Sequence, residues 1–122
     1  MTEQNTSSGE PSQRHVYILD YLMRLRQEKT RGLLLDMGEV DVTRMVAFID
    51  GYRACQRANG IRDEERIRFY DWLRDVKNEL PTEGWDVKYL RDCDGDHERA
   101  IQKFLDFVAE FVALREREKQ GG

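Results

Sequence analysis

Residues 96–112, DHERAIQKFLDFVAEFV, hold the clearest structural signal in this chain. Apolar side chains recur there with the spacing of one helix face, at Ile101, Phe104, Leu105, Val108, Phe111 and Val112. Asp96 stands directly before this pattern, where its side chain can accept a hydrogen bond from a free backbone N–H group of the first turn. The stretch therefore predicts a capped amphipathic helix with one face in a core.

The same spacing predicts three earlier helices, over residues 15–28, 43–58 and 63–80. Each is followed by a residue that ends helices, Gly32, Gly60 and Pro81 respectively. Either Asp41 or Thr43 can cap the second of these helices, and Asp63 can cap the third.

Two short apolar segments are ambiguous. We expect Leu33-Leu34-Leu35 to be a buried connection, and we favour a short helix over a strand for residues 85–90, because no convincing second strand exists to pair with them. The fold class is therefore all-α, a compact bundle of four long helices and one short helix. We expect a disordered tail over residues 1–13, a single helical domain over 14–118 and a frayed C-terminus over 119–122.

The apolar stripes also predict the core. The residues expected to be buried are Leu22, Ile49, Trp72, Leu73, Leu105 and Val108. Cys55 falls on the apolar face of the second helix, where it should pack as a small hydrophobic side chain. Gly51 in the same helix indicates either a close approach by a neighbouring group or simple tolerance of glycine.

Charge is distributed unevenly along the 122 residues, whose formal net charge is -4. Residues 71–98 contain nine acidic and four basic side chains. Such a segment repels phosphate backbones, so we expect no nucleic-acid partner and favour a basic protein instead. A solvated surface that only maintains solubility is the alternative. No apolar run has the length of a membrane span and no secretion signal is present, so we expect a cytoplasmic protein without membrane contact.

Residues 92–103 invite comparison with a calcium loop, because Asp92, Asp94 and Asp96 occupy its first, third and fifth positions. However, His97 stands where such a loop needs glycine, and Lys103 replaces the glutamate that closes the coordination shell. We therefore expect no calcium site there, and a polar turn instead.

The sequence offers no catalytic constellation. Cys55 and Cys93 lack the companion ligands of a zinc site. Cys93 and His97 straddle a predicted helix start, and nearby carboxylates disfavour a thiolate at Cys93. We therefore expect no metal, no cofactor and no enzymatic activity.

Binding is the remaining function class. Among the aromatic residues, Trp72 fits the core, whereas Trp85, between Gly84 and Asp86, is the more plausible exposed anchor for a partner. The candidate partner-binding residues are Asp71, Asp75, Glu79, Glu83, Trp85, Asp86, Asp92 and Asp94.

The segments Ile18 to Arg26, Ala47 to Ala54 (AFIDGYRA), Gly84-Trp85 and Ala100 to Phe111 carry a resemblance to a known group. Over residues 16–112 the chain resembles small bacterial proteins of the immunity type that occur beside polymorphic toxins. It departs from them after the first helix, where residues 29–33 replace a Pro-Gly-aromatic turn. The resemblance implies a protein that neutralises a toxin by binding it, without catalysis. The alternative is a helical adaptor or regulatory interaction module.

Overall fold

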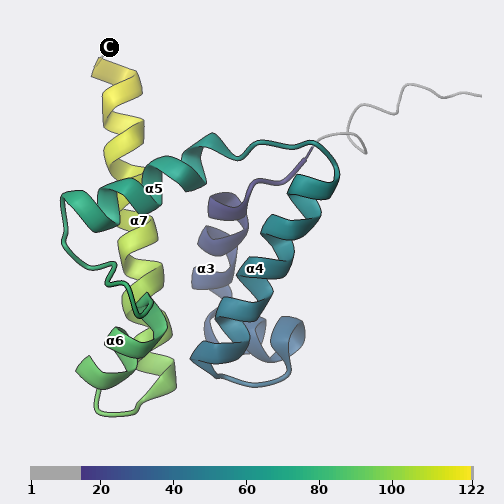
Figure 1. Cartoon of the computed structure of the whole chain (residues 1–122), viewed down its shortest axis with the longest axis vertical. Helices are drawn as coiled ribbons and strands as arrows, with labels where there is room; N and C mark the ends of the chain where they lie inside the picture. Colours follow the sequence, from purple (N-terminus) through teal and green to yellow (C-terminus); the bar gives the residue numbers. More distant parts are fainter. Residues whose placement is uncertain (1–14, 122) are drawn as a thin grey trace, which may run out of the picture.

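The computed structural model describes residues 15–121, and within them the chain forms five helices and no strand (Figure 1). The helices are α3 (Ile18–Met37), α4 (Val42–Ala58), α5 (Glu64–Asp75), α6 (Trp85–Asp92) and α7 (His97–Gly121). The all-α prediction and the short helix at 85–90 are thus confirmed. The expected tail over 1–13 lies outside the described residues. Helix α7 continues to Gly121, past residue 118 where we expected the domain to end.

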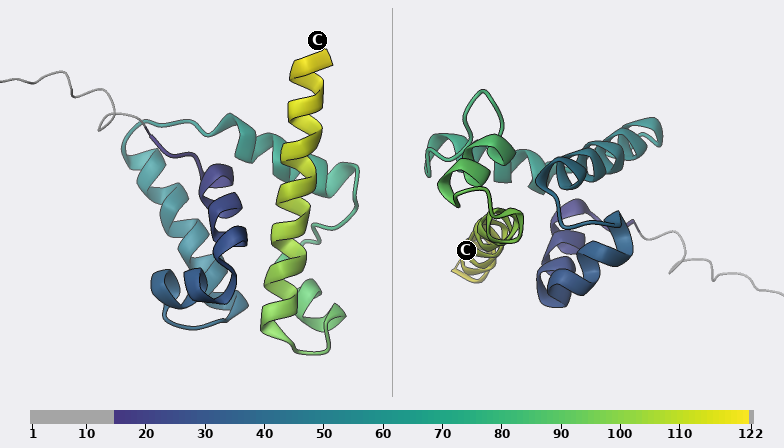
Figure 2. Two further views of the ribbon diagram at one scale, coloured as in Figure 1. Left: turned by 180° about the vertical axis from the view of Figure 1, so that it is seen from behind. Right: turned by 90° about the horizontal axis from the view of Figure 1, so that it is seen from below.

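The helices form two pairs, α3 with α4 and α6 with α7, and α5 crosses from one pair to the other. Helices α3 and α4 pack together on one side, α6 packs along the first half of α7 on the other, and α3 also contacts α7 (Figure 2). Helix α5 crosses the end of the molecule opposite α6, and the last turns of α7 project beyond it (Figure 1). Among residues 15–121, no helix combines the length and apolar character that a membrane crossing needs.

The core lies where these helices meet. The side chains of Phe69, Tyr89 and Phe104 are its largest fully buried members. Five of the six residues predicted to be buried are buried, namely Leu22, Ile49, Leu73, Leu105 and Val108. The sixth, Trp72, is only partly buried at its edge.

Aspartates begin three of the helices as predicted. The side chains of Asp41, Asp63 and Asp96 accept hydrogen bonds from the backbone N–H groups of the residues three positions later, over 3.0, 3.2 and 3.1 Å. The cap of α4 is therefore Asp41 and not Thr43.

Helix α3 is longer than predicted. The backbone is interrupted at Lys29, with φ 58° and ψ -141°, but helix continues through Gly32 to Met37 and ends at Gly38 in the left-handed conformation. The buried connection predicted for residues 33–35 is therefore wrong. Successive helical residues point about 100° apart, so three neighbours cannot all face the core. Leu33 is buried, whereas Leu34 and Leu35 are 50% and 72% exposed.

Three other predictions also need correction or resolution. Helix α5 ends at Asp75, well before Pro81, and Asn78 in the following connection has a positive φ. Cys55 is exposed and so does not pack in the core. A Cβ atom at Gly51 would meet no described atom within 4 Å, so tolerance of glycine explains that residue and close approach does not.

Candidate functional site

We call the seven candidate carboxylates from Asp71 to Asp94 the acidic surface. This surface extends over the second half of α5, the connection after it, α6 and the turn that follows α6. At its α5 end, Arg74 binds two of the predicted carboxylates, Asp71 over 3.2 Å and Asp75 over 2.8 Å. The hydrogen bond from Arg74 lowers the pKa of the Asp75 carboxyl. The two carboxylates that stand four residues apart on α5 therefore share a counterion, Arg74, on the same helix.

A four-membered charge network forms the centre of this surface. Lys88 Nζ lies 3.1 Å from Glu79 Oε1 and 2.8 Å from Asp92 Oδ2, and Lys103 Nζ lies 2.9 Å from the same Asp92 oxygen. Hydrogen bonds from Lys88 and Lys103 lower the pKa of Asp92 to about 2. The two lysines thus join the connection, α6 and α7 through two carboxylates.

Tyr89 lies directly beneath this network. Its buried hydroxyl group donates a hydrogen bond to the backbone carbonyl of Glu79 over 2.9 Å, and the Lys103 ammonium lies 4.7 Å from the centre of its ring. Burial raises the pKa of the Tyr89 hydroxyl above its ordinary value. These contacts fix the connection against α6, so the charges above it have defined positions.

The remaining predicted residues are one carboxylate with a cation partner, two carboxylates without one among the described residues, and the buried Trp85. Glu83 lies 3.4 Å from Arg91, whereas Asp86 and Asp94 have no cation within ion-pair distance among residues 15–121. Trp85 is 5% exposed and stacks on Phe104 with the ring centres 4.0 Å apart. The prediction of Trp85 as an exposed anchor is therefore wrong. Gly84 has φ 104°, which turns the chain so that Trp85 enters the core.

The calcium-like loop is occupied by other interactions. Asp92 is engaged by two lysines, and Asp96 caps α7. His97 accepts a hydrogen bond at Nδ1 from the backbone N–H of Val42 over 3.1 Å, so it connects α7 to α4. Within residues 15–121, no three His, Cys, Asp or Glu side chains are arranged to hold a metal ion.

Asp63 forms a buried polar junction that the sequence indicated only in part. One of its oxygens accepts from the N–H of Arg66, and the other accepts from the N–H of Ile18 over 3.0 Å and from Gln56 Nε2 over 2.9 Å. Gln56 Nε2 also lies 2.9 Å from His15 Nε2. One carboxylate therefore caps both α3 and α5, and its role is structural.

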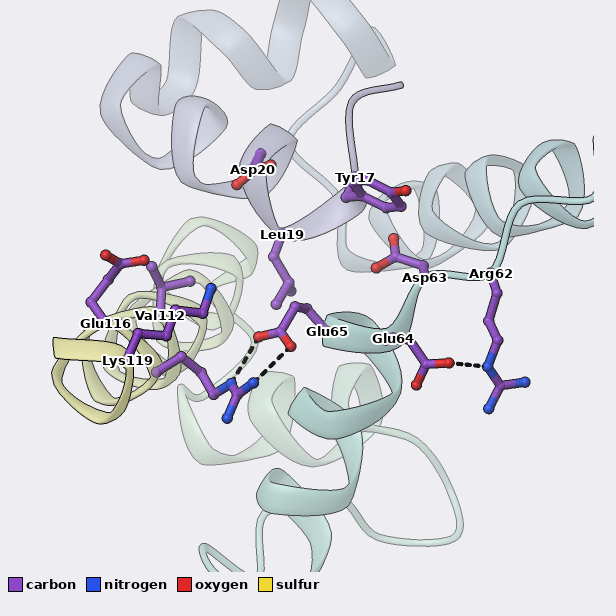
Figure 3. A pocket seen from close by; sticks show the side chains of 11 residues that line it. Tyr17, Leu19, Asp20, Arg62, Asp63, Glu64, Glu65, Val112, Glu116 and Lys119 are labelled. Carbon is purple, nitrogen blue, oxygen red and sulfur yellow. Dashed lines mark hydrogen bonds and ion pairs between the residues drawn. The ribbon is translucent and has the colours of Figure 1, made fainter. Parts of the chain in front are cut away.

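A cavity of about 290 Å³ lies beside this junction, between the first turns of α3 and α5 and the last turns of α7 (Figure 3). Glu65 is bound there by two hydrogen bonds from Arg115, over 2.9 and 3.1 Å, which lower the pKa of the Glu65 carboxyl. Arg62 is paired with Glu64. Its two arginines already have carboxylate partners, and its other charged side chains include both signs, Lys119 against Asp20 and Glu116.

A second concave region has a lining that is mostly cationic. Four arginines, Arg53, Arg57, Arg62 and Arg66, line a hollow of about 410 Å³ between the end of α4 and the start of α5, which we call the arginine groove. This cluster is not evident from the sequence charge, because acidic and basic residues nearly balance over residues 36–70. The signal available was five arginines within residues 53–68.

Comparisons of this chain with protein-family models, with curated proteins and with solved structures gave no match.

Proposed function

We propose that the chain is a non-enzymatic interaction module that binds and inhibits a basic protein, in the manner of an immunity protein acting on a bacterial toxin. The observation that carries this proposal is a surplus of negative charge on the acidic surface. Seven carboxylates there face four cations, Arg74, Lys88, Arg91 and Lys103, while Lys77 in the same connection is paired with Glu110 of α7. Formal counting therefore leaves a net charge of about -3.

Pairing and net charge have different consequences for binding. Ion pairs fix the positions of the side chains, whereas the attraction felt by a distant partner depends on the net charge that remains. Asp86 and Asp94, which lack cations among residues 15–121, contribute to that surplus. The surface is therefore suited to accelerating association with a basic protein while its charge network stays in place.

The acidic carboxylates differ in whether they can be replaced without disturbing the fold. Glu79 belongs to the partly buried network with Lys88 and Lys103, so replacing it would disturb the fold. Asp71 and Asp75 are exposed and share one cation. The double variant Asp71→Asn/Asp75→Asn should therefore reduce charge without unfolding the chain. The matched control is Glu28→Gln/Glu116→Gln, two exposed carboxylates outside the acidic surface.

The assay is surface-binding kinetics, at two salt concentrations, against toxin domains encoded beside the gene for this chain. The acidic-surface variant should associate more slowly than the control and show a weaker dependence on salt, because screening has less charge to act upon. Association rates that are equal for the two variants, or that do not respond to salt, would contradict the proposal.

One observation favours the second candidate, a helical adaptor. Leu34 and Leu35 are exposed on the last turns of α3, where an apolar partner helix could pack. Replacing Leu35 by Ser should weaken the binding of such a partner with little effect of salt. A partner whose binding depends on Leu35 and not on Asp71 and Asp75 would identify the adaptor.

A further inference from the structure

The arginine groove contains cations without partners. Arg53, Arg57 and Arg66 have no carboxylate within ion-pair distance among residues 15–121, whereas Arg62 is paired with Glu64. Elsewhere in the molecule, Arg74 and Arg115 are each held by two carboxylates. Other arginines, such as Arg31 and Arg117, are also unpaired among residues 15–121, but three unpaired arginines line this one hollow.

Two further features make this arrangement unfavourable without a ligand. Arg53 and Arg57 stand four residues apart on α4, so their like charges repel each other along one helix face. The Nε atom of Arg66 is buried and has no hydrogen-bond partner among residues 15–121, which costs free energy. An anion in the groove would relieve the repulsion between Arg53 and Arg57 by lying between their charges.

The groups that could repel an anion from the groove are already engaged. Among residues 15–121, Asp63 is the only carboxylate that lines it, and the Asp63 oxygens accept hydrogen bonds from Ile18, Gln56 and Arg66. The carbonyls at the end of α4 accept hydrogen bonds from the backbone N–H groups of Asn59, Gly60 and Ile61. The lining therefore contains four arginines and one carboxylate, and both oxygens of that carboxylate already accept hydrogen bonds.

Next to the groove lies a second hollow of about 360 Å³, and Arg53 and Arg66 line both. Its walls include the apolar side chains of Ile49 and Leu80 and the rings of Tyr70 and Trp85. The Arg66 guanidinium lies 5.9 Å from the centre of the Tyr70 ring, which orients it between the two hollows. Asp50 and Asp86 also line this second hollow, so the anionic end of a ligand belongs in the first.

We propose that the arginine groove binds a phosphate monoester, with Arg53, Arg57 and Arg66 donating to its terminal oxygens and the attached organic group lying in the adjoining hollow. A carboxylate has two oxygens and is satisfied by a single arginine, as Glu65 is by Arg115. A phosphate monoester presents three terminal oxygens, and these can accept from three guanidinium groups at once. Asp50 and Asp86 can accept hydrogen bonds from hydroxyl or amino groups of the organic part.

The experiment is isothermal titration calorimetry of the full chain with inorganic phosphate and with adenosine 5′-monophosphate, each against sodium chloride at equal ionic strength. We expect both phosphates to bind, and the monophosphate to bind more tightly because it also fills the adjoining hollow. Equal affinity for the two would overturn the placement of the organic group. Heats no larger than those of sodium chloride would overturn the site itself.

Variants identify the groove. Arg53→Gln/Arg57→Gln should weaken phosphate binding by a factor of about 10 to 100, because hydrogen bonds from two charged donors are lost. The control Arg31→Gln/Arg117→Gln removes the same charge from exposed arginines outside the groove and should leave binding unchanged. Equal weakening by both pairs would show non-specific attraction and refute the proposal. So would tighter binding of an oligoglutamate peptide than of either phosphate, since it would assign the groove to acidic protein segments.

Discussion

Replacing Asp63 by Ala should destabilise this protein more than the loss of any exposed helix cap. The carboxylate is 4% exposed and accepts three hydrogen bonds, from the backbone N–H groups of Ile18 and Arg66 and from the Gln56 amide. Loss of an N-cap costs about 1 kcal/mol, and each buried donor left without an acceptor costs a further ~1–3 kcal/mol. We therefore expect a loss of about 3–7 kcal/mol in the free energy of unfolding.

Asp96→Ala is the matched control. Asp96 is also an N-cap aspartate, but it is exposed and accepts one hydrogen bond, from the N–H of Arg99 over 3.1 Å. Its replacement should cost about 1 kcal/mol. Thermal unfolding followed by circular dichroism should show a fall in melting temperature of roughly 12–28 °C for Asp63→Ala and roughly 4 °C for Asp96→Ala.

The result that would refute this reasoning is an equal loss for the two variants. It would mean that water replaces the carboxylate at Ile18 and Gln56, so that the junction contributes no more than an ordinary cap. Asp63→Asn should fall between the two, because the amide keeps one acceptor oxygen and presents a donor in place of the other.

Three further predictions concern the core, a helix and the charge network. Trp85→Ala should lower the free energy of unfolding by about 3–5 kcal/mol in chemical denaturation, because Trp85 stacks on a core ring. The control Val87→Ala, at an exposed position of the same helix, should lower it little. A small effect of Trp85→Ala would contradict the burial of this side chain. Gly51→Ala should raise stability by about 0.5–1 kcal/mol, since a Cβ atom there meets nothing within 4 Å. Gly32→Ala should lower stability, since its Cβ atom would lie 2.9 Å from both Glu28 Cβ and Leu25 Cδ1; the opposite order would contradict the packing. The pKa of the Asp92 carboxyl is lowered from 3.8 to about 2, so its contribution to stability is present above pH 3.8 and is lost as the pH falls through about 2. In acid unfolding over that interval, the Asp92→Asn variant should therefore lose less stability than the wild type. Equal losses would count against the lysine contacts.

Helix positions were predictable from the sequence because the signals that define them are local. The apolar period and the caps Asp41, Asp63 and Asp96 all act within a few residues of the helix that they start. The error at Gly32 has a local cause as well. Glycine ends a helix only where it adopts a positive φ, and Gly38 does so while Gly32 does not.

The acidic surface was predictable as a set of positions but not as a set of contacts. The spacing of Asp71 and Asp75 along α5 can be read from the sequence, and so can the excess of acid over residues 71–98. The pairing of Asp92 with Lys103 joins residues eleven positions apart through the turn between α6 and α7. No rule of helical spacing places those two side chains together.

The sequence by itself determined that this chain is helical, where most of its helices begin, and which apolar faces they bury, because hydrophobic period and helix capping are properties of short segments. Only the tertiary structure decided that Trp85 is buried and Trp72 lies at the edge, that Asp63 caps two helices, and that four arginines from α4, α5 and the connection between them share one groove. Those outcomes depend on how helices distant in sequence pack against one another. Packing is fixed by the fit of all the faces together, and a single segment carries no record of its neighbour.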